Sequence, residues 1–269
     1  MSGPGLLYVY TVVESGAEPL CVDGIGGVGG GPGLRVIGDG VVAAVAEPVD
    51  PADFDEGALR GRLEDLDWLS TLARAHHRVV AAVGRSRTTV PLRLATVCRG
   101  EEGVLRLLAE GRDRLCRALA RVEGAEEWGV KLYAAAPDGA AAGRPGPDPG
   151  PGSGAAAGRE YLQRRLGDRR RREARAGLAA RTAEQLHGRL AAQAAGAVLH
   201  PPQQARLSGA VGTNVLNAAY LVPREGRQAF LAGVPGPDAL PPGLHVDVTG
   251  PWVPYSFTQD PGAEQGGRR

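Results

Sequence analysis

The sequence has few of the residues that mark a particular compartment. Among 269 residues there are three cysteines, Cys21, Cys98 and Cys116, without a CxxC pair, and this sparse, odd number fits a reducing cytoplasm better than a disulfide framework. No uninterrupted apolar run approaches the ~18–20 residues of a membrane span. The first residues, MSGPG, lack the charged-then-apolar pattern of a signal peptide. We therefore expect a cytoplasmic protein without a membrane span.

Aromatic residues and lysine are also scarce. Aromatics make up 4% of the chain, and Lys131 is the only lysine beside 30 arginines. The net charge of +1 argues against nucleic acid as a globally electrostatic partner. A hydrophobic content of 43% supports a core built mainly of Leu, Val and Ala, and the length allows one large or two ordinary domains.

Motifs that carry catalysis are missing as well. There is no GxSxG elbow, no HExxH and no P-loop. A formal GxGxxG lies in the glycine-rich stretch Gly24–Gly33, but no helix follows it directly, so we expect a mobile loop there. Cys98 with His76 or His77 could form a thiol–imidazole pair, although a cysteine that ends an apolar strand is more often a small core residue. We therefore expect no enzyme, no cofactor and no metal site.

The first half of the chain shows alternating strand and helix patterns. In Leu6–Val13, Tyr8 and Tyr10 share one face of a strand, and Leu7 and Val9 share the other. The other predicted elements are a hairpin of residues 34–37 and 41–45 around Gly38-Asp39-Gly40, a helix from about Gly57 to Val83, a strand over Thr88–Val97, and a helix from Glu101 that ends at Gly124.

The second half begins with a strand in EEWGVKLY and continues into a Pro/Gly/Ala segment, residues 134–158, that we expect to be a disordered insertion. The elements predicted after it are a long helix, Arg159–Leu199, strands at Arg206–Val211 and Val215–Val222, a helix at Arg224–Ala232, and a strand at Gly243–Thr249. The order β-α-β-β-α-β is typical of a ferredoxin-like domain. The fold class is therefore α+β with two domains: an N-terminal domain of residues 1–125, a C-terminal ferredoxin-like domain of residues 126–250 with a long helix, and an extended C-terminal tail, 251–269.

A run of four arginines, Arg169–Arg172, lies within the predicted long helix. It could contact phosphates or an acidic partner, or it could be a solvated helix face beside Asp168, Glu173 and Glu184. We favour the solvated face, because no aromatic residues are interleaved to stack on bases.

The motif GPWVPYSF, Gly250–Phe257, gathers three of the twelve aromatics, Trp252, Tyr255 and Phe257. Two prolines, at positions 251 and 254, prevent it from continuing as a central strand. The aromatics either pack back onto their own protein or act as exposed anchors for a partner. We favour packing, because an exposed aromatic cluster promotes aggregation.

Four stretches in this order resemble the gas vesicle proteins of the GvpL/GvpF family, and the likeness runs from Leu6 to about Phe257. They are DLDWLSTLARAHHRVV (Asp65–Val80), VPLRLATV (Val90–Val97), EEWGVKLY (Glu126–Tyr133) and GPWVPYSF. Leu94 and Ala95 stand where the family more often has Phe-Gly, which we interpret as packing variation.

The resemblance implies an accessory or minor structural protein of gas vesicle assembly, built as two α+β domains, with no catalytic role. It would engage the hydrophobic shell protein and other accessory proteins in a chaperone-like or nucleating role, at the gas vesicle and in the cytoplasm. Candidate structural or partner-contact residues are Arg93, Trp252, Tyr255 and Phe257. Two alternatives remain open: a ferredoxin-like ligand-binding or regulatory module, and a nucleic-acid-binding protein that uses the arginine-rich helix.

Overall fold

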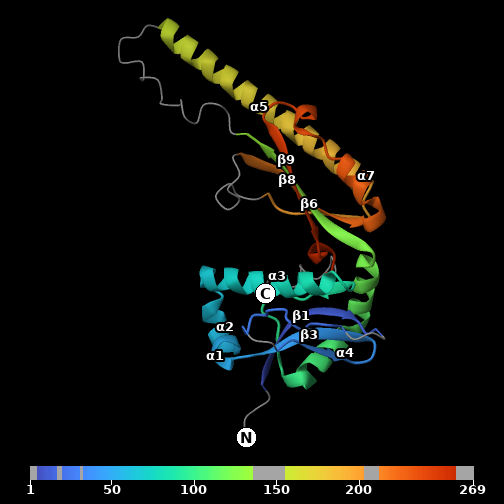
Figure 1. Cartoon of the computed structure of the whole chain (residues 1–269). Helices are drawn as coiled ribbons and strands as arrows, with labels where there is room; N and C mark the ends of the chain where they lie inside the picture. Colours follow the sequence, from blue (N-terminus) through green and yellow to red (C-terminus); the bar gives the residue numbers. More distant parts are fainter. Residues whose placement is uncertain (1–4, 17–19, 31–32, 136–154, 203–211, 259–269) are drawn as a thin grey trace. The chain divides into compact units, whose positions relative to one another are not determined.

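The computed structural model describes residues 5–16, 20–30, 33–135, 155–202 and 212–258, which divide into two compact units (Figure 1). The first unit contains Met1–Glu127 together with Pro251–Arg269, and the second contains Trp128–Gly250. Of the predicted C-terminal tail, residues 251–258 are therefore part of the first unit. Both units combine helices with a sheet, which agrees with the mixed helix-and-sheet class expected from the sequence.

The first unit is built on an antiparallel sheet with β1 at its centre. Its strands are β1 (Leu6–Glu14), β2 (Arg35–Gly38), β3 (Val42–Val49), β4 (Thr89–Pro91) and β5 (Val97–Arg99). The order is β2-β3-β1-β4, and β5 also pairs with β1. The β2–β3 hairpin closes on Asp39, whose carboxylate accepts hydrogen bonds from the backbone N–H groups of Val41 and Val42, and Gly40 adopts a φ of 91°. This confirms the predicted hairpin.

β1 is buried on both faces because a helix covers each side of the sheet. A first cluster joins Leu7 and Val9 to residues of α4 (Gly100–Val122), and a second joins Tyr8 and Tyr10 to residues of α3 (Leu66–Gly84). The two predicted faces of β1 are thus confirmed. The register shifts between Val9 and Thr11, and a bulge of this kind exchanges the faces of the residues that follow.

The predicted helix 57–83 is in fact interrupted. The chain forms α1 (Pro51–Phe54), α2 (Glu56–Arg62) and α3, and the break lies at residues 63–65. The Asp65 carboxylate accepts hydrogen bonds from the backbone N–H groups of Asp67 and Trp68, at 3.0 and 3.1 Å. Such an N-cap satisfies donors at a helix start, so Asp65 begins a new helix where hydrophobic periodicity alone suggests continuity.

The predicted strand Thr88–Val97 is also divided, into β4 and β5, because a turn over residues 92–96 separates them. Ala95 in this turn has a φ of 64°, the only positive φ of a non-glycine residue in the described part of the chain. Glycine adopts this conformation freely and alanine does not, so at Ala95 the difference from Phe-Gly concerns the backbone as well as the packing against the second cluster.

The second unit packs helices against a four-stranded sheet of order β7-β8-β6-β9. Its helices are α5 (Ala155–Ala191) and α7 (Arg227–Ala232), and its strands are β6 (Ala125–Ala134), β7 (Gly196–Leu199), β8 (Thr213–Pro223) and β9 (Leu244–Trp252). Three 3₁₀ turns, η1 (Arg224–Gly226), η2 (Pro237–Ala239) and η3 (Tyr255–Phe257), complete the described elements of both units.

Three expectations for the second half change. The long helix ends at Ala191, not at Leu199, since residues 196–199 pair with β8 as β7. The predicted strand 206–211 and most of the insertion, residues 136–154, lie outside the described residues, while residues 134 and 155–158 belong to β6 and α5. β9 also continues through Pro251 into GPWVPYSF, which a proline permits because β9 is an edge strand.

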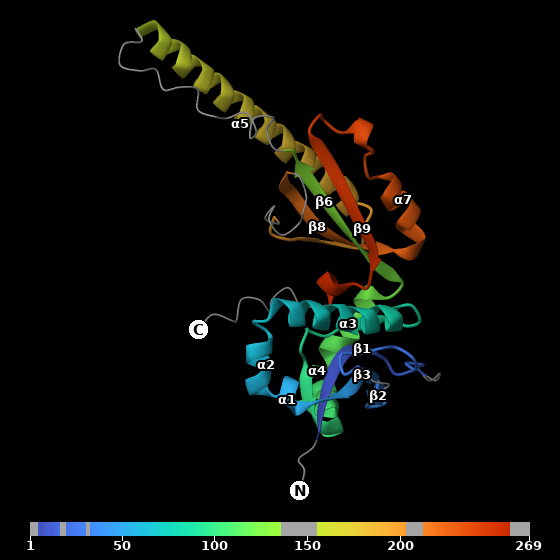
Figure 2. The same ribbon diagram turned by 60° about the vertical axis from the view of Figure 1, so that its left-hand side comes forward.

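The core of the second unit lies between the sheet and only the second half of α5. Ala183, Leu186 and Leu190 of α5 pack with Tyr220 of β8 and Phe230 of α7. Residues 161–178 of α5 are exposed or nearly so, and the first half of the helix extends past the end of the sheet (Figure 2). At 1.5 Å per residue the whole helix is ~55 Å long.

Candidate partner-contact site

The described residues of the first unit hold no catalytic constellation. His76 is buried and shares a hydrogen bond of 3.0 Å between its Nδ1 and the hydroxyl of Tyr8, so it does not activate Cys98. Burial raises the pKa of the Cys98 thiol, which disfavours the thiolate. In the described part of the chain, no group of three or more His, Cys, Asp or Glu residues could hold a metal ion. None of its helices is long and apolar enough to cross a membrane.

A buried carboxylate explains the glycine-rich stretch. Glu47 of β3 is 1% exposed, receives a hydrogen bond from the Tyr10 hydroxyl, and accepts another from the backbone N–H of Gly29 at 2.9 Å. The backbone N–H of Val28 donates to the Tyr10 hydroxyl at 2.7 Å. A Cβ at Gly27 would lie 2.4 Å from the carboxylate oxygens of Glu47, so this position requires glycine.

The described part of this stretch therefore covers the core and is not the mobile loop we expected. Val22 is buried, and Ile25 and Val28 pack against the second cluster. The carboxylate of Glu47 beneath the stretch would repel a phosphate. These contacts exclude the dinucleotide-binding interpretation of the GxGxxG pattern on physical grounds.

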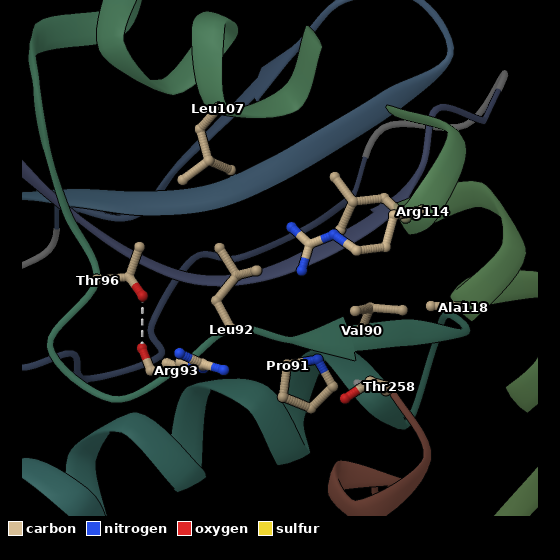
Figure 3. Close-up of a pocket in the computed structure, with 10 residues that line it drawn as sticks. Val90, Pro91, Leu92, Arg93, Thr96, Leu107, Arg114, Ala118 and Thr258 are labelled. Carbon is tan, nitrogen blue, oxygen red and sulfur yellow. Dashed lines mark hydrogen bonds between the residues drawn. The ribbon is translucent and has the colours of Figure 1, made fainter. Parts of the chain in front are cut away.

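The turn between β4 and β5 forms one wall of a pocket, shown in Figure 3. The backbone N–H of Ala95 donates to the Tyr8 hydroxyl at 3.1 Å, which ties the turn to the buried network. The Thr96 hydroxyl donates to the carbonyl oxygen of Arg93 at 2.6 Å. These two hydrogen bonds hold the turn in a defined shape and place Arg93 at the pocket.

The pocket has a volume of about 320 Å³ and combines cationic groups with apolar walls. Arg93 comes from the turn and Arg114 from α4, while Val90, Leu92 and Leu107 supply apolar surface (Figure 3). Leu115 adds to this surface. A Cβ at Gly111 would lie 3.3 Å from Nη2 of Arg114, so the small residue leaves room for this guanidinium. Such a pocket can bind an apolar group beside a carboxylate, but its lining contains no nucleophile with a general base.

The segment after β9 is held to the first unit by hydrogen bonds. Ser256 donates from its backbone N–H and from its hydroxyl to the two carboxylate oxygens of Glu127, both at 2.8 Å. Arg121 of α4 donates to the carbonyl oxygen of Phe257 at 3.4 Å. A Cβ at Gly84 of α3 would lie only 2.6 Å from the Cγ2 of Val253. The segment after β9 thus packs closely against α3 and α4.

The four candidate contact residues occupy different environments. Arg93 lines the pocket beside Thr258, which follows directly after Phe257. Phe257 is 6% exposed, while Trp252 is 43% exposed and meets the ring of His77 at 5.5 Å. Tyr255 meets the same histidine at 6.1 Å, and burial raises the pKa of its hydroxyl. Trp252 is therefore partly exposed, although its ring contacts that of His77.

Sequence reasoning missed two residues of the pocket, Arg114 and Thr258. Arg114 lies one helical turn after Gly111, and a glycine within an otherwise regular helix was the available signal for a close approach. Thr258 could not be found from its sequence neighbours, because only the folding of the chain after β9 brings it to the pocket.

Two solved structures that share this fold are gas vesicle proteins. GvpF from Anabaena sp. PCC7120 matches with a TM-score of 0.62 and 18% identity over 95% of this chain and 97% of that chain. GvpF from Microcystis aeruginosa matches with a TM-score of 0.57 and 17% identity over 94% of this chain and 99% of that chain. At such identities the likeness establishes the fold alone, which is the fold of GvpF-type proteins.

Comparisons of sequence identify the family. The family described as "Gas vesicle synthesis protein GvpL/GvpF" matches residues 6–259. Gas vesicle protein L of Streptomyces sp. (strain CB03234) is 47% identical over 257 residues, which cover 96% of this chain and 94% of that protein. The chain belongs to the GvpL/GvpF family of gas vesicle proteins, which confirms the resemblance seen in the sequence. Membership supports a role in gas vesicle assembly.

Proposed function

We propose that the protein assists gas vesicle assembly by binding the hydrophobic shell protein and other accessory proteins, in a chaperone-like or nucleating role. The observation that carries this proposal is the exposed first half of α5. Leu162 and Leu166, one turn apart, are 59% and 54% exposed. Helices gain most of their stability from packing an apolar face, so a helix of this length without a packed face is suited to a partner.

The proposal also has a physical motive. A shell subunit with large apolar surfaces would aggregate unless another protein covers those surfaces before assembly. We place this activity in the cytoplasm and at the growing vesicle, with no catalytic step.

We further infer that the second unit is a domain of the ferredoxin-like type. From β6 to β9 its described elements follow the order strand, helix, two strands, helix, strand, with the strands arranged β7-β8-β6-β9. This chain order is that of the split βαβ fold. The first half of α5 then is an extension beyond what the fold needs to cover its sheet.

Co-expression with the shell protein tests the proposed function. We expect the affinity-tagged protein to retain the shell protein and to increase the soluble fraction of it. A variant with the exposed Arg60→Ala substitution on α2 serves as a control for surface changes. The proposal would be contradicted if cells that lack the gene still formed vesicles in normal number. It would also be contradicted if the tagged protein retained no shell protein at low and moderate salt. Retention of nucleic acid with a steep salt dependence would instead support the nucleic-acid alternative.

A further inference from the structure

A groove opens in the second unit where α5 leaves the sheet. Among the residues of α5 whose burial is described, 159 and 161–191, Ala179 is the first buried one, and before it the helix extends past the ends of β6 and β9 (Figure 2). The groove has a volume of about 690 Å³. Its apolar lining comes mainly from alanines, among them Ala134, Ala176, Ala179 and Ala180, together with Val215 and Leu244. A volume in the range of ~300–1,000 Å³ is typical of ligand sites, and small side chains allow a partner to approach closely.

Two arginines of α5, Arg172 and Arg175, also line this groove. Together with Ala179 they lie on the side of the helix that bears Leu186 and Leu190, because these positions differ by near multiples of 3.6 residues. Along one helix face the side chains thus change from leucine over the sheet to alanine and arginine over the groove. A helix face that only covered a hydrophobic core would carry apolar side chains, not guanidinium groups, at positions 172 and 175.

The charges of these two arginines are at most partly balanced within the described residues. Neither arginine forms a salt bridge with a carboxylate in this part of the chain, although Asp168, which pairs with Arg171, also interacts electrostatically with Arg172. Arg169 pairs with Glu173 at 2.7 Å, and Arg171 pairs with Asp168 at 2.5 Å. The helix as a whole has ten arginines and four acidic residues, a net charge of +6, so the remainder of the chain carries −5. The positive charge is therefore concentrated on this element.

We propose that the groove binds an amphipathic helix of a partner protein that presents apolar side chains flanked by two carboxylates. The apolar side chains of about one turn enter the groove, and the carboxylates pair with Arg172 and Arg175. These arginines are three residues apart, or ~4.5 Å along the helix, which matches Asp or Glu residues one turn apart on the partner. Because arginine binds a carboxylate through two parallel hydrogen bonds, each pair fixes orientation as well as charge.

The composition of the groove favours a protein segment over nucleic acid. The lining contains no aromatic residue on which a base could stack, and most of it is apolar. The inference rests on the proposed function, since it assigns the place where a partner of assembly would bind.

A peptide-binding experiment with the full-length protein tests the groove. The probe is a fluorescein-labelled, 18-residue helical peptide with leucines on one face and two glutamates one turn apart. We expect Arg172→Glu/Arg175→Glu to weaken its binding at least tenfold. The matched control is Arg170→Glu/Arg181→Glu, which makes the same charge change on the opposite face of the same helix and should alter binding less than twofold. Circular dichroism confirms that both variants are folded.

Two changes of the probe separate charge from shape. Replacing its glutamates by lysines should abolish binding to the natural protein and restore binding to Arg172→Glu/Arg175→Glu. Replacing its leucines by alanines should weaken binding at least tenfold, and Ala176→Phe, which fills the groove, should do the same while the outward-facing Ala174→Phe does not.

Several results would overturn the inference. Equal losses in the two double variants would mean non-specific attraction to a basic helix. Competition by a single-stranded DNA oligonucleotide of the same charge, with equal affinity, would identify a polyanion site. A change of sedimentation in Arg172→Glu/Arg175→Glu without loss of peptide binding would mean that a second copy occupies the groove. If groove variants still retain the shell protein, the groove assignment fails and the proposed function stands. If the natural protein binds the peptide but never the shell protein, the groove assignment stands and the proposed function fails.

Discussion

Acidification should destabilise the first unit through one buried histidine. His76 is 4% exposed and packs against the rings of both Tyr8 and Tyr10, which also contact each other. Burial, and to a smaller extent the neighbouring His77, lowers the pKa of His76 from 6.5 to about 4. The imidazole is therefore neutral in the folded protein over the whole neutral and mildly acidic range.

The magnitude follows from the difference between the two states. Between pH 6.5 and about 4 the unfolded chain binds a proton at this histidine and the folded chain does not, so the free energy of unfolding falls as the pH falls. At ~1.4 kcal/mol for each pKa unit the full loss is about 3 kcal/mol, and it levels off below the folded pKa. Over the interval from pH 7 to pH 5, where most carboxylates stay ionised, the expected loss is about 2 kcal/mol.

Urea unfolding from pH 7 to pH 5, followed by tryptophan fluorescence, measures this loss. His76→Gln should be less stable at pH 7 because it disturbs the bond to Tyr8, but its stability should vary with pH by about 2 kcal/mol less than that of the natural protein. His245→Gln, a change at the exposed histidine that stacks on Tyr133, is the control and should keep the natural slope. Parallel pH profiles for the natural protein and His76→Gln would refute the argument.

Three substitutions test other parts of the first unit. Ala95→Gly should raise the free energy of unfolding by about 0.5–1 kcal/mol, because the strain of a φ of 64° outweighs the added freedom of the unfolded chain; urea unfolding that shows no gain would contradict this. Gly27→Ala should lower it by about 1–3 kcal/mol through the clash with Glu47, while Gly26→Ala, with a nearest contact of 3.5 Å, should leave it nearly unchanged. Trp252→Ala should cost about 1–2 kcal/mol in the same assay, less than the ~3–5 kcal/mol of a fully buried aromatic, since 43% of the residue is already exposed; a larger loss would mean that it is a structural anchor.

Local pattern predicted most element types but misplaced the ends of several. The two faces of β1 and the hairpin at Asp39 follow from alternation and turn residues, which are local properties. The helix predicted through residue 199 was too long, because residues 196–199 gain partners in β8 that no local pattern reveals. The break at Asp65 was missed because the leucine periodicity continues across residues 63–65, although aspartate is a common N-cap residue.

The candidate site shows the same division. The resemblance of motifs led to Arg93 and to Trp252, but not to Arg114, which reaches the pocket from α4. The sequence also contained the arginine run, yet it could not separate Arg172 from its neighbours. That distinction depends on where α5 leaves the sheet.

The sequence by itself determined the family, the mixed helix-and-sheet class and the concentration of arginine on one long helix, since these depend on motifs, periodicity and composition. Only the tertiary structure decided that a glycine-rich stretch covers a buried Glu47, that Ala95 occupies a glycine conformation, and that Arg172 and Arg175 face an apolar groove. These three features depend on contacts between residues far apart in the chain, or on a backbone angle that such contacts impose. A local sequence pattern encodes neither the contacts nor the angle.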